Sequence, residues 1–165
     1  MLGRLLYTDM IVIKNFQEFE QHVGQDLGTS SWHTITQEQI NKFADATLDH
    51  QWIHTDPERA KTDSPFKTTI AHGYLTLSLI PHLWKEIVKI ENLKMEINYG
   101  IENLRFAQPA LVDSEVRLKV KLASLLNLRG VIKATMAIEM EIKDQRKPAF
   151  NGEVVFLYHF WIDNS

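Results

Sequence analysis

The C-terminal half of the chain alternates between apolar and polar residues with a period of two. Residues 116–122 (VRLKVKL) alternate strictly, and residues 132–142 follow the same pattern. Because successive side chains of a β-strand point to opposite faces, this pattern predicts two long strands, each buried on one face. A turn near residues 127–130 is expected to join them. The denser apolar segment 152–161 predicts a central strand, and residues 97–106 a further one.

Before these strands, residues 71–90 are apolar on nearly every side of a predicted helix. A surface helix would carry a polar stripe, so this helix is expected to be buried. Pro81 lies too deep for a first turn and should kink or interrupt the helix. One buried helix followed by a run of antiparallel strands predicts the α+β class, with the sheet packed around the helix.

The N-terminal third carries shorter helical signals. Residues 1–30 are interpreted as a lead-in, with a helix expected over 15–23. Residues 5–13 would either pack on the domain or mediate association. Thr36 and Gln39 form a capping box that predicts a helix start. A second start falls at Thr55 with Glu58 or, one residue later, at Asp56 before a proline, and both registers stay open.

Composition and charge restrict the class of protein. The 165 residues are 44% hydrophobic and 24% charged, as expected for one folded domain spanning 1–165. A net charge of −3 disfavours nucleic acid as a partner. The lack of cysteine excludes disulfides, thiolate metal sites and cysteine nucleophiles, and fits a reducing compartment. No apolar run is long enough to span a bilayer, and the N-terminus does not resemble a signal peptide. We therefore expect a cytoplasmic protein with no membrane partner.

The most unusual stretch is 48–54 (LDHQWIH), which lies between two predicted helices. On one continuous helix Asp49 and His54 would point apart, but in a loop they can converge. A carboxylate and an imidazole that share a water suit general acid–base chemistry. The alternative, given equal weight from the residues alone, is that Asp49 caps a turn and His54 is a hydrogen-bonded core histidine.

His50 and His54 also have the spacing of a zinc-protease motif. However, Gln51 stands where that motif needs its general-base glutamate, and a new helix starts directly after His54. We therefore expect no metal.

Gly73 lies at the head of the apolar helix, within 69–74 (TIAHGY). The first N–H groups of a helix have no internal partner, and a glycine allows close approach, so this end could bind a developing oxyanion. Gly73 could equally be a packing glycine where helix and sheet meet, and spacing does not separate the two.

Two motifs together resemble a known family. Residues 43–54 (FADATLDHQWIH), followed by Asp56-Pro57 and Ala60, resemble the signature of MaoC-like hotdog-fold enoyl-CoA hydratases, and 70–79 (IAHGYLTLSL) resembles the start of their central helix. The match is closest to the nodulation-protein-N-like branch, which carries residues similar to 98–100 and 105–106. The resemblance implies a hotdog fold, a curved antiparallel sheet around a long central helix, usually in a homodimer.

The resemblance also implies an activity: hydration of trans-2-enoyl thioesters, or the reverse dehydration, without a cofactor. Asp49 would activate the water, and His54 would hold it and assist proton transfer. The Gly73 N–H would stabilise the enolate oxygen, with His72 and Tyr74 beside it in the oxyanion and substrate-binding group. The substrate would be a thioester of coenzyme A or of an acyl carrier, its acyl chain lying in an apolar tunnel near the dimer interface.

The sequence departs from the family pattern at four positions: Leu48, where many hydratases have glycine, Gln51, Trp52 and Pro81. If position 48 needs a positive φ, a branched leucine is strained there and could re-aim Asp49. A weakly active or non-catalytic acyl-thioester binding protein is therefore the second hypothesis, and a hotdog thioesterase the third.

Overall fold

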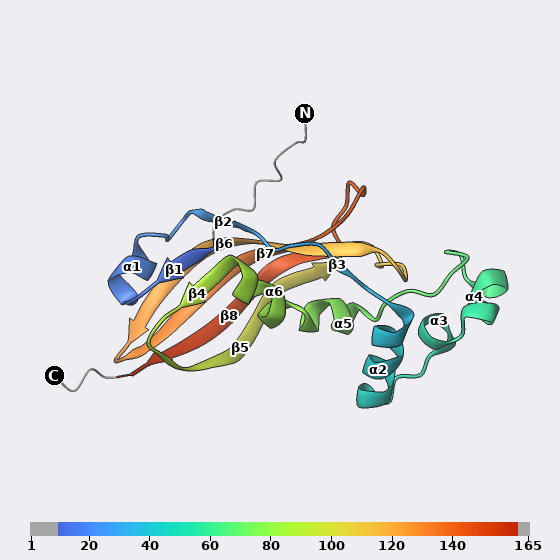
Figure 1. Cartoon of the computed structure of the whole chain (residues 1–165), viewed down its shortest axis with the longest axis horizontal. Helices are drawn as coiled ribbons and strands as arrows, with labels where there is room; N and C mark the ends of the chain where they lie inside the picture. Colours follow the sequence, from blue (N-terminus) through green and yellow to red (C-terminus); the bar gives the residue numbers. More distant parts are fainter. Residues whose placement is uncertain (1–9, 162–165) are drawn as a thin grey trace.

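The computed structural model describes residues 10–161, which form an α+β architecture (Figure 1). Within this range the main sheet has six strands in the order β2-β6-β7-β8-β5, with β3 also paired to β6, and its pairings are antiparallel. Its strands are β2 (Asp26–Thr29), β3 (His33–Thr34), β5 (Leu93–Phe106), β6 (Glu115–Leu128), β7 (Val131–Ile142) and β8 (Phe150–Phe160). A separate parallel pair joins β1 (Ile11–Ile13) to β4 (Val88–Ile90).

The β6–β7 hairpin confirms the strands expected from the alternation. Every second residue of β7 is buried, and β6 follows the same rule over its first half. The two-residue turn places Arg129 at φ 57° and Gly130 at φ 95°, as a hairpin turn with two left-handed residues requires. Asn127 accepts a 2.8 Å hydrogen bond from the Gly130 N–H.

The remaining two long strands were also predicted. β8 lies between β7 and β5, which confirms its central place. β5 starts four residues earlier than expected, at Leu93, and forms an edge of the sheet among the described residues.

The short helices are α1 (Phe16–Glu20), α2 (Gln37–Thr47), α3 (Trp52–Thr55) and α4 (Pro57–Asp63). Thr36 caps α2 as predicted, accepting a hydrogen bond from the Gln39 N–H. Of the two helix starts left open by the sequence, the structure has the one at Asp56. Its side chain caps α4 by accepting a 3.0 Å hydrogen bond from the Arg59 N–H. The Thr55 register is wrong because Thr55 ends α3, and its hydroxyl lies 3.3 Å from the carbonyls of residues 50 and 51.

The expected central helix over 71–90 is two helices, α5 (Gly73–Ser78) and α6 (Ile80–Ile87). They meet at Leu79, and Pro81 occupies the first turn of α6, where a residue without an N–H is tolerated. The interruption expected from Pro81 is thus confirmed, and it lies at Leu79, two residues before the proline. The helical expectation for 88–90 is wrong, because these residues pair with β1 as strand β4. Burial is also incomplete, since Tyr74 is 70% exposed.

α5 and α6 lie along the inner side of the curved sheet, and α2, α3 and α4 gather beyond one end of it (Figure 1). Ile80 and Trp84 of α6 face Leu118, Met136 and Phe156 from three neighbouring strands. Burying one such large apolar side chain contributes about 1.5–3 kcal/mol. The architecture is the hotdog fold that the family resemblance implies.

Residues 11–29, expected as a lead-in, contribute Ile13, Phe19 and Leu27 to the core. The described part of segment 5–13 therefore packs on the domain. Residues 1–9, which include most of the segment considered as a signal peptide, lie outside the described range. Among the described residues, no helix is both long and apolar enough to cross a membrane.

Candidate active site

Asp49 is positioned by the end of α2. The helix stops at Thr47, and Leu48 adopts the left-handed conformation with φ 62° and ψ 19°. The positive φ suspected from the sequence is therefore present, and a leucine occupies it. The Leu48 side chain is 82% exposed, so it points into solvent.

His54 lies in α3 and is buried. Its Nδ1–H donates a 2.7 Å hydrogen bond to the carbonyl of Ile70, because a carbonyl oxygen can only accept. In the neutral ring this leaves Nε2 as an acceptor. The backbone of His54 is held as well, since Gln37 donates to its carbonyl at 2.7 Å and accepts from Thr69.

His72 precedes α5 and connects the other two side chains. Its Nε2–H donates to the backbone carbonyl of Asp49 at 3.0 Å, and its ring stacks on that of His54 with centroids 3.8 Å apart. Asp49 Oδ2 lies 3.9 Å from the same nitrogen.

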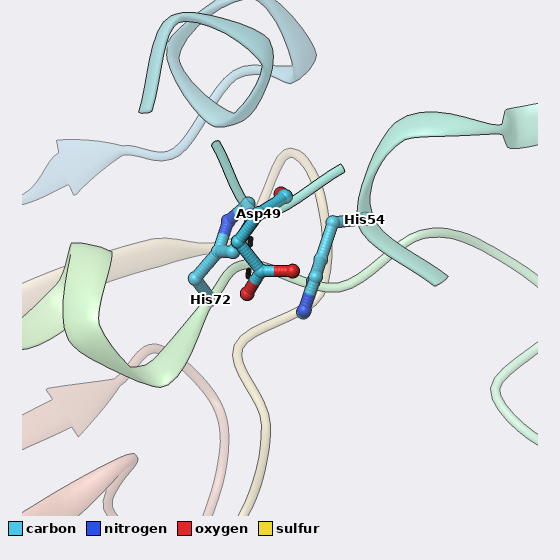
Figure 2. A group of neighbouring side chains, drawn as sticks. All are labelled: Asp49, His54 and His72. Carbon is cyan, nitrogen blue, oxygen red and sulfur yellow. Dashed lines mark hydrogen bonds and ion pairs between the residues drawn. The ribbon is translucent and has the colours of Figure 1, made fainter. Parts of the chain in front are cut away.

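Figure 2 shows Asp49, His54 and His72 gathered in one group. One polar atom of each side chain lies within 4.8 Å of the other two. The convergence predicted for Asp49 and His54 is thus present. Two acceptors that share one water lie about 4.5 Å apart, a separation that this 4.8 Å limit allows. Both parts of the alternative are also present: Asp49 Oδ1 accepts a 3.4 Å hydrogen bond from the Gln51 N–H, as a turn cap does, and His54 has the hydrogen bond of a core histidine.

Burial lowers the pKa of His54 below its usual value, and the neighbouring His72 lowers it further. The Ile70 carbonyl and the Asp49 carboxylate oppose this shift. Since burial is the largest cause, His54 is neutral near pH 7 and its Nε2 can accept a hydrogen bond from water.

The same trio offers two histidines and a carboxylate, which is a set that metals use. Its geometry is unfavourable for an ion, because a ring nitrogen binds metal along a lone pair in the ring plane. The two rings are stacked at an interplanar angle of 24°, so their lone pairs run alongside each other rather than converging. The His72 nitrogen nearest the carboxylate already donates to the Asp49 carbonyl.

Gly73 and Tyr74 lie on a pocket of about 500 Å³ that His54 also lines, together with the apolar side chains Phe66, Ile70, Phe106 and Pro109. A Cβ on Gly73 would lie 2.9 Å from Cε1 of Phe106, so the packing reading of Gly73 holds. The oxyanion reading remains compatible with it, because Gly73 is the first residue of α5 and its N–H has no acceptor among the described residues.

The other residues of the motif lie outside this group. His50 is exposed, 3.7 Å from Asp45, and precedes α3, so it shares no helix with His54 as the metal motif would require. Gln51 is exposed, and Trp52 packs under the guanidinium of Arg59 at 4.4 Å.

Sequence reasoning missed three contributors: Gln37, the Ile70 carbonyl and the Phe106 ring over Gly73. A backbone carbonyl has no residue signature, and Gln37 looks like any polar first-turn residue of a helix. Phe106 figured only as part of the family resemblance.

The chain matches known proteins both in sequence and in fold. The family model described as "MaoC like domain" matches residues 18–143. The chain is 46% identical to 3-hydroxyacyl-thioester dehydratase Z of Mycobacterium tuberculosis, over 82% of this chain and 89% of that protein. It is 41% identical to nodulation protein N of Rhizobium meliloti, over 84% and 87%. The structure of the (R)-hydratase from A. caviae, described as involved in PHA biosynthesis, superposes with a TM-score of 0.66 at 27% identity, over 81% and 94%.

Proposed function

Because the chain belongs to the MaoC-like dehydratase family, we propose that it hydrates trans-2-enoyl thioesters to (R)-3-hydroxyacyl thioesters, or catalyses the reverse dehydration. The observation that carries this proposal is the approach of the Asp49 carboxylate to His54 beside an apolar pocket. The thioester would be carried by coenzyme A or by an acyl carrier protein.

In this mechanism one water donates its two hydrogen bonds to Asp49 and to Nε2 of His54. The Ile70 carbonyl holds the proton of His54 on Nδ1, so Nε2 is the acceptor that the water needs. The water oxygen then bonds to C3 of the enoyl group while Asp49 takes one of its protons. The π electrons move to the thioester oxygen, and the resulting enolate receives at C2 the proton that Asp49 took from the water, which returns Asp49 to its carboxylate form. One water is consumed, and no metal or other cofactor is required.

The Gly73 N–H is proposed to stabilise the enolate oxygen. It begins α5 on the same pocket as His54, where the positive end of the helix dipole adds to the hydrogen bond. Tyr74 lies edge-on to Phe106, with ring centroids 6.1 Å apart, and together they would form an apolar wall along the substrate.

The protein is proposed to act as a homodimer through β5. This strand pairs only with β8 among the described residues and carries Met95, Ile97, Tyr99 and Ile101, each more than a third exposed. An exposed apolar edge strand is a template for pairing with a second chain.

Two other functions remain as alternatives. The strained Leu48 favours an acyl-thioester binding protein with little turnover, and an exposed carboxylate beside a thioester pocket could direct water onto the carbonyl carbon, as in a thioesterase. The second reaction releases free thiol, which hydration does not.

The test is hydration of crotonyl-CoA, followed by loss of enoyl-thioester absorbance and by a thiol assay. We expect the wild type to consume the absorbance without releasing thiol. Asp49→Asn and His54→Ala should each lower kcat by about 10²- to 10⁴-fold, because each removes an acid–base group. Asp45→Asn, the same change of carboxylate to amide at an exposed position of α2, is the matched control.

Thiol release would support the thioesterase. Acyl-CoA binding without turnover, unchanged by Asp49→Asn, would support the binding protein. Wild-type activity in either Asp49→Asn or His54→Ala would refute the assigned roles.

A further inference from the structure

His72 is a buried histidine that local stability does not explain. It is 3% exposed, and its Nδ1 has no hydrogen-bond partner among the described residues. Because the Asp49 carbonyl fixes the proton on Nε2, this Nδ1 is an acceptor without a donor. A buried polar atom without a partner destabilises a fold, so a phenylalanine would fill this space at less cost.

The same ring touches both members of the proposed catalytic pair. Its Nε2–H holds the Asp49 backbone at 3.0 Å, and its face stacks on His54 at 3.8 Å. Phe43 packs against it as well, with ring centroids 5.0 Å apart, so the ring is wedged between α2 and α3.

Asp49 needs such an anchor. It follows the strained, solvent-facing Leu48, and its side chain is 55% exposed. The hydrogen bond from His72 is the shortest polar contact that Asp49 makes within the described range, since the Gln51 N–H lies at 3.4 Å.

We propose that His72 is a positioning residue that sets the distance between Asp49 and His54 at which both can hold one water. This inference rests on the proposed function. His72 acts by holding the backbone of one partner and the ring of the other, and it does not itself touch the water or the substrate.

The test compares His72→Phe, His72→Gln and the wild type. Phenylalanine keeps the burial and the aromatic ring but removes the donor, whereas glutamine can offer an N–H near the position of Nε2. We expect His72→Phe to lower kcat by about 10- to 100-fold, because misplacement of reacting groups by about 1 Å costs that much. KM should change less than about twofold, the melting temperature should not fall, and His72→Gln should recover part of the lost rate. His50→Phe, which removes an exposed histidine outside the group, is the control.

Wild-type kcat in His72→Phe would overturn the proposal. A loss of activity that follows a loss of melting temperature in both variants would overturn it too, because a purely structural role predicts that.

A second measurement does not depend on turnover. In protein labelled with ¹⁵N-histidine and ¹³C-aspartate, His72→Phe should shift the Asp49 carbonyl resonance and move the titration of His54 to higher pH, because a neighbouring imidazole that can carry charge has been removed. If the wild type hydrates no enoyl thioester, the proposed function fails, and these resonances still decide the positioning role. Unchanged Asp49 and His54 resonances would overturn it.

Discussion

Replacing Leu48 with glycine should stabilise the protein, although it removes a large side chain. The left-handed conformation costs a non-glycine residue about 1–2 kcal/mol, and Leu48 sits in it at φ 62°. Glycine loses about 0.5–1 kcal/mol more backbone entropy on folding. The leucine side chain is 82% exposed, so little burial is lost. The net expectation is a gain of about 0.5–1 kcal/mol, which corresponds to a rise in Tm of about 1–4 °C for a domain of this size.

Urea and thermal unfolding of three variants test this reasoning. Leu48→Ala keeps a Cβ and therefore the strain, so it should bring no gain. Ala46→Gly, an exposed change in the last turn of α2, should cost up to about 1 kcal/mol, which is the cost of glycine in a helix interior. If Leu48→Gly destabilised the protein as much as Ala46→Gly, the argument from left-handed strain would be refuted.

Leu48→Gly also tests whether the leucine has re-aimed Asp49. An oxygen of the carboxylate already lies within 4.8 Å of a ring nitrogen of each histidine. We therefore expect crotonyl-CoA hydration by Leu48→Gly to stay within about twofold of the wild type. A tenfold gain in kcat would mean that the observed position of Asp49 is not the productive one.

Three further predictions concern other parts of the molecule. Gly73→Ala should destabilise the protein by about 1–3 kcal/mol, since the new Cβ would lie 2.9 Å from the Phe106 ring, and adding Phe106→Ala should remove this clash in thermal unfolding. Burial raises the pKa of Glu96, although Lys85 opposes the shift, so the folded protein holds this proton more tightly than the unfolded chain. The resulting cost is absent below the unfolded pKa of about 4.3 and grows as pH rises above it, so Glu96→Gln should stabilise at pH 8 but not at pH 4 in urea titrations. Ile101→Lys should convert the proposed dimer to monomer in sedimentation velocity, and an unchanged sedimentation coefficient would contradict a β5 interface.

The sequence by itself determined the strands and the helix starts. The alternation over 116–122 and 132–142 reports a sheet with one buried face, and Thr36 and Asp56 mark helix ends through their own side chains. Pro81 predicted an interruption of the central helix, because proline has no backbone N–H to donate within a helix. These signals are local, since each depends on a residue and its near neighbours in the chain.

Tertiary structure decided where the apolar run stops being helical. Residues 88–90 are compatible with either helix or strand, and they became β4 because β1, more than seventy residues earlier in the chain, pairs with them. The sequence likewise did not say whether Leu48 has a positive φ. The path of the chain from α2 to Asp49 places it in the left-handed conformation.

The site shows the same division. The motif 48–54 was sufficient to single out Asp49 and His54, but not to say how they are held. The Ile70 carbonyl that fixes the His54 proton and the His72 ring that joins both partners lie 16 and 23 residues further along the chain from the groups they bind. Such contacts produce no periodic pattern in the sequence from which they could be predicted. Their distances are set by how α2, α3 and α5 pack together and not by spacing along the chain.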